Sequence, residues 1–220
     1  MSASAAVCVS TLLVFLPGVT AQHQEDVRNS FEFAARAADR ASGDDYTAWF
    51  STFKRTLINI HWFSQQDGLA RDVEGLVLDS LDFSVSEREL LIRALNALQQ
   101  KAENEDALKL FNNSVLSTVD QDAVTRLLFI GGGSYRGKYQ LAVCSESNGA
   151  VAVSTSYARF EVDGAQYRSV LYSDGQVETK TTISLHVLGL NSEQYAKVRD
   201  SIKQRLEDSG VSEQAPVSGL

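Results

Sequence analysis

Cys144 is the residue of this sequence with the most distinctive chemistry. The chain of 220 residues contains two cysteines, and the other one, Cys8, lies close to the N-terminal end. Cys144 ends a stretch that alternates like a β-strand, so we expect it to lie inside the fold. An internal thiol of this kind serves as a packed core group, a nucleophile, or an attachment point for an acyl chain.

Catalysis by this thiol would need a base, and His186 is the candidate because it falls in another expected strand. The imidazole would have to reach the thiol, and no cysteine-hydrolase signature surrounds Cys144. Glu146 is expected to point to the opposite face of the strand, which makes it a poor base. The histidines His23, His61 and His186 are widely separated and lack the spacing of metal ligands, so we expect no metal.

Residues 132–138 match the G-x-x-x-x-G-K pattern of a phosphate-binding loop. Such a loop opens a helix and continues with Ser or Thr, whose hydroxyl binds Mg²⁺. Here Tyr139 follows and the strand pattern continues. We therefore interpret the stretch as a turn and expect no nucleotide.

The overall charge and composition exclude several functional classes. The formal net charge is −8, whereas a nucleic-acid-binding protein needs a basic surface, so we expect no nucleic-acid partner. The same charge provides no general attraction to anionic lipid. Two cysteines are too few for a disulfide scaffold or a cysteine-rich zinc module.

The N-terminal part, residues 1–116, is expected to be mainly helical. Thr20 is placed to cap a helix that ends at Gly43, and Asp44 or Asp45 begins a second helix with an aromatic stripe. Val73 and the leucines that follow predict a third helix. Ser84–Glu87 matches a capping box before another helix, and residues 105–111 predict a shorter one.

The apolar run from Ala5 to Leu16 has two interpretations. Its length and the small residues Val19–Ala21 resemble a cleaved signal peptide, but the first 27 residues contain no Lys or Arg. The alternative is a buried strand that ends at Pro17 and Gly18. The sequence does not decide whether the protein is secreted or cytoplasmic.

The C-terminal part, residues 117–190, changes to a β pattern. Strands are predicted at residues 137–145, 150–162, 166–173 and 177–188, separated by Asn148-Gly149, Asp163-Gly164 and Asp174-Gly175, which are hairpin dipeptides. Residues 191–209 form a final helix, and 210–220 are expected to fray. The predicted class is therefore α+β: an N-terminal helical half packed on a C-terminal four-stranded antiparallel meander, closed by a helix, in one domain over residues 1–220.

Small side chains are predicted to gather near the thiol. Ala142 shares the face of Cys144, because alternate residues of a strand point to the same side. Four small residues share one face of the next strand, and the Asn148-Gly149 turn would bring that face beside Cys144. The four are Ala152, Ser154, Ser156 and Ala158. Such a face would accept a closely packed helix or an acyl chain, and a register slip of one residue would undo it.

Two segments of the chain carry a family resemblance. Leu12–Thr20 with His23–Ser30 resembles the opening of a family of bacterial and fungal proteins similar to the Erwinia virulence factor, Evf. Tyr139–Gly149 resembles the cysteine strand and turn of that family. The resemblance implies an α/β fold, a palmitoyl group on Cys144, a role in virulence and no known enzymatic activity. It also makes residues 16–20 part of the folded domain.

We therefore expect a non-enzymatic, lipid-associated protein of the virulence or toxin type, with covalent palmitate on Cys144. Its expected partners are lipid or a membrane and a host target. One alternative is a pore-forming or membrane-perturbing cytolysin, whose helices separate from the sheet. Another is an acyltransferase or hydrolase that depends on Cys144 and His186.

Overall fold

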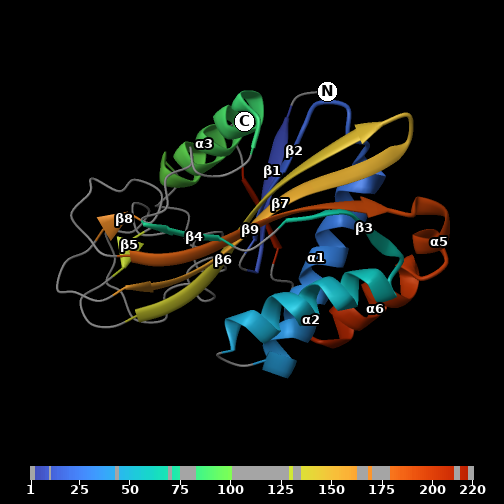
Figure 1. The fold of residues 1–220 in the computed structure, drawn as a ribbon. Coiled ribbons are helices and arrows are strands. Elements are labelled where there is room, and N and C mark those ends of the chain that lie inside the picture. The colour runs from blue at the N-terminus through green and yellow to red at the C-terminus, as the bar shows by residue number, and fades with distance from the viewer. Residues whose placement is uncertain are drawn as a thin grey trace.

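The structure is a computed structural model that describes residues 3–9, 11–42, 45–68, 71–74, 83–100, 129–130, 135–162, 168–169, 179–210 and 214–217. Strands and helices alternate along the chain, and the two ends of the chain lie on the same side of the molecule (Figure 1). The elements are β1 Ser4–Cys8, β2 Thr11–Phe15, α1 Ala21–Ser42, α2 Tyr46–Asn59, β3 Trp62–Asp67, β4 Arg71–Glu74, α3 Val85–Gln100, β5 Phe129–Ile130, β6 Tyr135–Ser147, β7 Ala150–Val162, β8 Arg168–Ser169, β9 Thr179–Leu190, α5 Ser192–Ala196, α6 Arg199–Asp208 and β10 Gln214–Val217.

One sheet joins both ends of the chain. Among the described residues it has eight strands in the order β10-β1-β2-β6-β7-β9-β3, with β4 also paired to β9. Strands β2 and β6 are parallel, and the other neighbours in this sheet are antiparallel. The β2–β6 pairing connects residues about 130 positions apart in the sequence, so the N-terminal segment is an interior part of the sheet.

The α+β class is confirmed, but the four-stranded meander is wrong. Three of its strands exist as β6, β7 and β9, and Asn148 and Gly149 both take positive φ in the turn between β6 and β7. β7 pairs directly with β9. The described part of segment 166–173 is β8, which pairs with β5 in a separate sheet. The other two proposed turns, at 163–164 and 174–175, lie outside the described residues.

The predicted helix starts are confirmed where the structure describes them. The Thr20 hydroxyl accepts a bond from the His23 N–H, and the Asp45 carboxylate accepts from two N–H groups of the first turn of α2. The capping box before α3 forms in both directions between Ser84 and Glu87. The Asn191 side chain caps α5 in the same way. Each capping hydrogen bond joins residues within three positions of each other, so it does not depend on contacts distant in sequence.

Two expectations about secondary structure are wrong, and the mainly helical N-terminal part also contains strands. Val73 lies in strand β4, and the remainder of its expected helix is outside the described residues. The N-terminal part holds four strands beside its helices, because the apolar run forms the buried β1 and β2 and the segment after α2 forms β3. The tail does not fray throughout, since β10 pairs with β1 through Ala6 and Pro216. The helix expected at 105–111 is outside the described residues.

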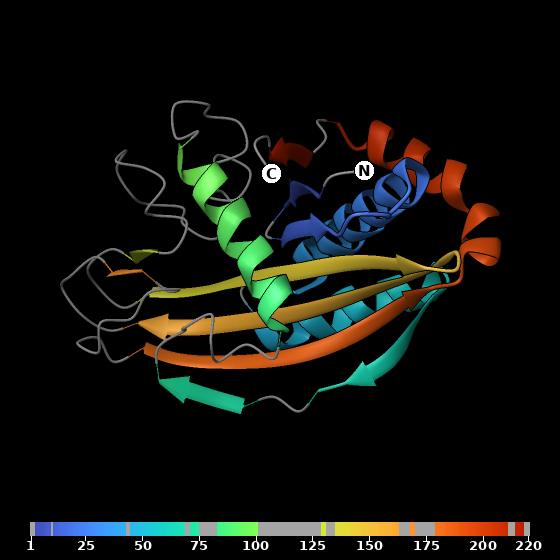
Figure 2. The ribbon, with the colours of Figure 1, turned by 90° about the horizontal axis from the view of Figure 1, so that it is seen from above.

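Helices cover both faces of the sheet (Figure 2). On one face, α1 and α2 pack over an apolar cluster in which Phe31, Phe53 and Trp62 meet edge to face. The α3 helix crosses the other face, over β2 and β6. Successive side chains of a strand point to opposite faces of the sheet. In a central strand, each side chain therefore packs either in the layer under α1 and α2 or in the layer on the α3 side.

Candidate functional site

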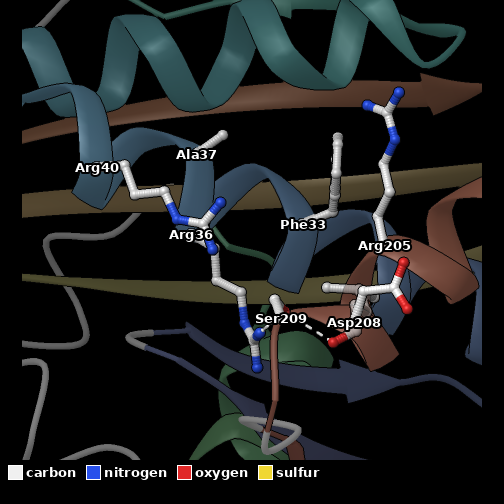
Figure 3. Close-up of a pocket in the computed structure, with 8 residues that line it drawn as sticks. Phe33, Arg36, Ala37, Arg40, Arg205, Asp208 and Ser209 are labelled. Carbon is white, nitrogen blue, oxygen red and sulfur yellow. Dashed lines mark hydrogen bonds between the residues drawn. The ribbon is translucent and has the colours of Figure 1, made fainter.

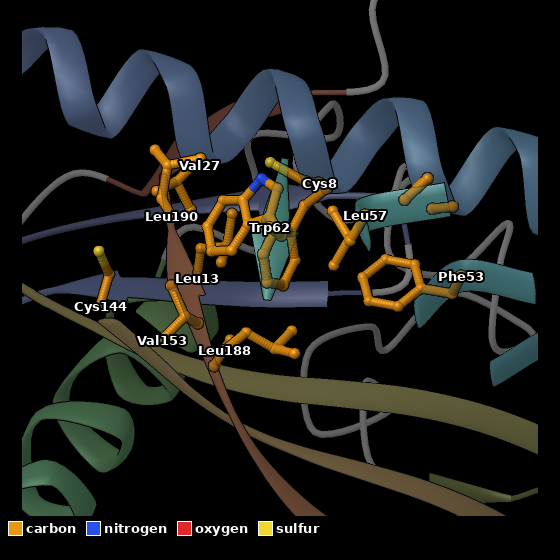
Figure 4. Packing of buried hydrophobic residues seen from close by; sticks show 14 of the residues in the cluster. Cys8, Leu13, Val27, Phe53, Leu57, Trp62, Cys144, Val153, Leu188 and Leu190 are labelled. Atoms are coloured by element: carbon orange, nitrogen blue, oxygen red, sulfur yellow. The ribbon is translucent and has the colours of Figure 1, made fainter. Parts of the chain in front are cut away.

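Cys144 lies in the apolar layer between the sheet and α1. It pairs with Phe15 of β2 on one side and Val153 of β7 on the other, and all three side chains belong to the same buried cluster. Cys144 is 0% exposed. Figure 4 shows its sulfur directed toward the helix side of the sheet, the side on which Val27 of α1 lies. Because the other cysteine, Cys8, is also buried, the two thiols cannot be ranked by burial.

The electrostatic setting keeps the Cys144 thiol protonated. Burial and, to a lesser extent, the nearby negative charge of Glu146 together raise the pKa of Cys144 to about 12. Thiolate, rather than thiol, is the reactive nucleophile. In the closed fold at neutral pH, Cys144 is therefore a core group and not an activated nucleophile.

The small residues predicted to surround the thiol do not lie beside it, with the exception of Ala142. The two-residue turn pairs Ser147 with Ala150, which places Cys144 opposite Val153 and Ala142 opposite Thr155. The other four small residues therefore point to the opposite face of the sheet. These four are Ala152, Ser154, Ser156 and Ala158. The prediction of a shared face was wrong by one residue of register, and the neighbours of Cys144 are larger apolar side chains.

His186 shares the sheet face of Cys144 but does not approach it. Thr155 of β7 pairs with both Ala142 and His186, so the imidazole lies two strands across and two residues along from the thiol. With strands about 4.8 Å apart and about 3.3 Å per residue, this separates the Cα atoms by about 12 Å. A hydrogen bond between Cys144 and His186 is excluded in this fold, so the predicted Cys/His alternative is wrong.

The imidazole of His186 instead belongs to a polar cluster at the β3 edge. Its Nδ1 lies 3.2 Å from Asp67 Oδ1, its Nε2 lies 3.2 Å from the Ser184 hydroxyl, and its ring packs on Phe50. Burial lowers the pKa of His186. The Asp67 carboxylate also accepts a bond from Lys54 at 2.8 Å, which holds its pKa well below the usual range. Since Asp67 is 56% exposed and already ion-paired, we interpret the cluster as an anchor between α2 and β3.

Glu146 is the polar residue nearest to Cys144 along its own face. Residues two apart on a strand share a face, so the expectation that Glu146 points away was wrong. Its Oε2 accepts the Thr20 N–H at 2.9 Å and lies 2.8 Å from His23 Nδ1. His23 Nε2 in turn lies 3.2 Å from the Ser192 hydroxyl. We call Thr20, His23, Glu146 and Ser192 the rim cluster, because it closes the layer at the ends of β6, α1 and α5.

Desolvation and hydrogen bonding act in opposite directions on Glu146. Burial raises its pKa, but the Thr20 N–H and the His23 side chain outweigh that effect, so the pKa of Glu146 is lowered overall. A carboxylate engaged in this way is not available as a base for the neighbouring thiol. The rim cluster therefore joins α1 to β6 without activating Cys144.

A buried ion pair fixes α1 to α6. Asp26 is 0% exposed, and its two carboxylate oxygens each accept a bond of 2.7 Å from Arg199. The Tyr195 hydroxyl donates to the Asp26 backbone carbonyl. Asp26 and Arg199 were not identified from the sequence as functional or structural partners. The missed signal is that Asp26 and Ser30 fall eight and four residues before Ala34, on the core-facing stripe, where a carboxylate requires a cationic partner.

Comparison with known proteins gives fold similarities at low identity. No family model matches the sequence, and no curated protein matches it. A solved δ-endotoxin matches with a TM-score of 0.41 and 10% identity, covering 84% of each chain. The activated Cyt2Ba monomer from Bacillus thuringiensis subsp. israelensis matches with a TM-score of 0.39 and 10% identity, covering 84% of this chain and 98% of that one.

The Evf virulence factor is a third solved structure similar to this chain. Its TM-score is 0.37, its identity is 10%, and the match covers 88% of this chain and 74% of Evf. This match is to the protein whose family the two sequence segments resemble. It concerns the fold, and it leaves the modification of Cys144 a prediction.

Proposed function

We propose that this protein is a non-enzymatic, lipid-associated protein of the toxin or virulence type, with a thioester-linked acyl chain on Cys144. The observation that supports this proposal is the meeting of the two segments that resemble the Evf-like family. Leu12–Phe15 pairs residue by residue with Leu141–Cys144. The Leu16 N–H then donates to the Cys144 carbonyl at 2.9 Å, and Thr20 and His23 contact Glu146.

Acylation of this thiol is an exchange between two thioesters. The Cys144 sulfur attacks the carbonyl carbon of an acyl thioester donor, the new S–C bond forms, and the donor leaves as a free thiol that takes up the Cys144 proton. The pKa raised by burial means that this step takes place while the rim cluster is open and the thiol is in water. The product is uncharged, so the closed apolar layer accepts it without burying a charge.

The energy available from burying the chain is large on the scale of a fold. At about 0.8 kcal/mol per CH₂, a chain of about sixteen carbons contributes on the order of 12 kcal/mol when it is fully buried. Protein cores are already close-packed, so the chain has to displace side chains or move α1 away from the sheet. The side chains in its path belong to Phe15, Val27, Val153 and Leu190.

Intact mass before and after neutral hydroxylamine tests the acyl group directly. Protein isolated from its native source is expected to lose the mass of one acyl chain on treatment. A Cys144→Ser variant should show no such loss, whereas a Cys8→Ser variant should behave like the wild type. Native protein whose mass corresponds to an unmodified chain would refute the acylation proposal.

A membrane-perturbing cytolysin is the second candidate, and the layout of the polar contacts favours it. The sheet face toward α1 and α2 is mainly apolar, but it carries a buried, hydrogen-bonded row of Thr11, Gln140 and Thr155. The polar contacts between helix and sheet lie at the margins of this face, as in Ser4 with Gln24 and Lys54 with Asp67. Separation of the layers would break these margin contacts and expose a mainly apolar face, whose buried polar row is hydrogen-bonded within the sheet itself. No helix in the described part of the chain is long and apolar enough to cross a membrane.

Dye release from phosphatidylcholine vesicles separates the two candidates. The Cys144→Ser protein, which has no acyl chain, is expected to release dye if the cytolysin proposal holds. Release that requires Cys144 and is lost after hydroxylamine would assign the membrane effect to the acyl chain. Absence of release by either protein would refute the cytolysin.

A further inference from the structure

A pocket of about 460 Å³ lies between the C-terminal halves of α1 and α6, away from Cys144. Three arginines line it: Arg36 and Arg40 from α1, and Arg205 from α6. Figure 3 shows the first two on the α1 side of the pocket and Arg205 with Asp208 on the α6 side. Asp208 is the one carboxylate among its lining residues, so the lining is cationic in a chain whose net charge is −8.

The three guanidinium groups differ in how firmly they are held. Arg36 forms an ion pair of 2.6 Å with the buried Glu32 and donates a hydrogen bond to the Ser209 hydroxyl. Arg40 and Arg205 are exposed, and neither forms an ion pair with another residue in the described part of the chain. The pocket thus combines one positioned cation with two that are open to an incoming anion.

The rest of the pocket is apolar. Phe33 and Ala37 of α1 and Leu206 of α6 contribute to its lining. Its volume falls in the range of about 300–1,000 Å³ typical of sites for small organic ligands. An inorganic anion alone would leave the apolar side chains of the lining without a packing partner. Guanidinium groups pair with phosphate, as they do with carboxylate, through two parallel hydrogen bonds. Two exposed arginines match the charge of about −1.5 to −2 on a phosphate monoester better than the single charge of a carboxylate.

We infer that this pocket binds a phosphate monoester, with the phosphate on Arg40 and Arg205 and the organic group against Phe33 and Leu206. The ligand is a soluble phosphate ester or the headgroup of a lipid such as phosphatidic acid. The site does not depend on Cys144. The competing explanation is that Arg40 and Arg205 stand in the last turns of their helices to complement the helix dipoles.

Calorimetric titration with glycerol 3-phosphate, and flotation with phosphatidylcholine vesicles that contain or lack phosphatidic acid, test this inference. Binding of glycerol 3-phosphate alone identifies a soluble ester as the ligand, and binding of the phosphatidic acid vesicles alone identifies a headgroup. Inorganic phosphate is expected to bind more weakly than the ester. Binding to neither probe would overturn the inference.

Single variants locate the binding. Arg40→Gln and Arg205→Gln are each expected to weaken binding about ten-fold or more, since each removes a charge-assisted contact. Asp208→Asn is expected to strengthen binding, because it removes the one repelling carboxylate. Arg55→Gln, the matched control, removes the same charge from an exposed position on α2 and should leave binding unchanged.

Two outcomes of the variant series overturn the site. If Arg55→Gln weakens binding as much as Arg40→Gln, the effect is one of overall charge. If Arg40→Gln and Arg205→Gln change only the melting temperature, the helix-dipole explanation holds. The Cys144→Ser variant should bind like the wild type, so this inference and the acylation proposal fail independently.

Discussion

Replacement of Arg199 by methionine is the sharpest test of how the helical layer is held together. Arg199 on α6 donates two hydrogen bonds of 2.7 Å to the carboxylate of Asp26 on α1, and Asp26 is completely buried. Methionine keeps most of the length of the side chain but removes both donors. Among the residues that the structure describes, the Asp26 carboxylate would then retain only the bond of 3.1 Å from Gln22.

The expected loss of stability follows from leaving a buried charge without its partner. Breaking a buried ion pair from one side costs about 3–5 kcal/mol. The Arg199 side chain is 24% exposed, which lets water reach the site, so we place the loss near the lower end, at about 3 kcal/mol. An unfolding entropy of about 2.1 cal/mol/K per residue gives about 0.46 kcal/mol/K for this chain, so the melting temperature should fall by about 6 or 7 °C.

Urea unfolding at pH 7, followed by tryptophan fluorescence, measures this loss. The matched control is Lys203→Met on the same helix, which removes an exposed ion pair of 2.7 Å with Glu25 and should cost less than about 1 kcal/mol. A double variant with Asp26→Asn should recover part of the loss, because it no longer buries a charge. If Arg199→Met and Lys203→Met were equally stable, the structural role assigned to Asp26 and Arg199 would be refuted.

Three further perturbations test other parts of the fold. Gly68→Ala should cost about 1–3 kcal/mol, because a Cβ there would lie 2.0 Å from the Leu185 backbone oxygen, which cannot move aside as a side chain would; unchanged urea stability would contradict this contact. Asp45→Ala should cost about 1 kcal/mol through the loss of the α2 cap, and restoration by Asp45→Ser but not Asp45→Val would identify capping as the cause. Burial lowers the pKa of His186, so protonation from pH 6.5 downward favours the unfolded chain; the wild type should therefore lose more stability between pH 6.5 and 5 than His186→Gln, and parallel pH profiles would count against a buried neutral imidazole.

The helices were predictable because their signals are local. The cap residues at Thr20, Asp45, Ser84 and Asn191 each act on N–H groups within three positions. The failure at Val73 shows the limit of such signals. A segment of four residues with one apolar side chain fits either a helix or an edge strand, and its pairing with β9, more than 100 positions away, decides between them.

The sheet could be predicted only in part, because its order depends on contacts distant in sequence. Nothing near Thr11–Phe15 indicates that this segment pairs with β6 rather than with β7 or β9. The face of Cys144 is a different case, since it could have been derived. A two-residue turn at Asn148 and Gly149 pairs positions 147 and 150, and counting back places Val153 opposite Cys144.

The structure around Cys144 favours retention of a thioester over turnover. Turnover needs an exposed thiolate and a free base, whereas Cys144 is buried and protonated, and the one carboxylate nearby is held by Thr20 and His23. The same features protect an acyl group once it is attached, because hydrolysis would need water and a base at the buried carbonyl carbon. Loading and release therefore both require the rim cluster to open, and opening is also the first step by which the apolar face of the sheet would meet a membrane. Under the two proposals above, acylation and membrane perturbation would be two outcomes of one movement, whose cost is set by the polar contacts of α1.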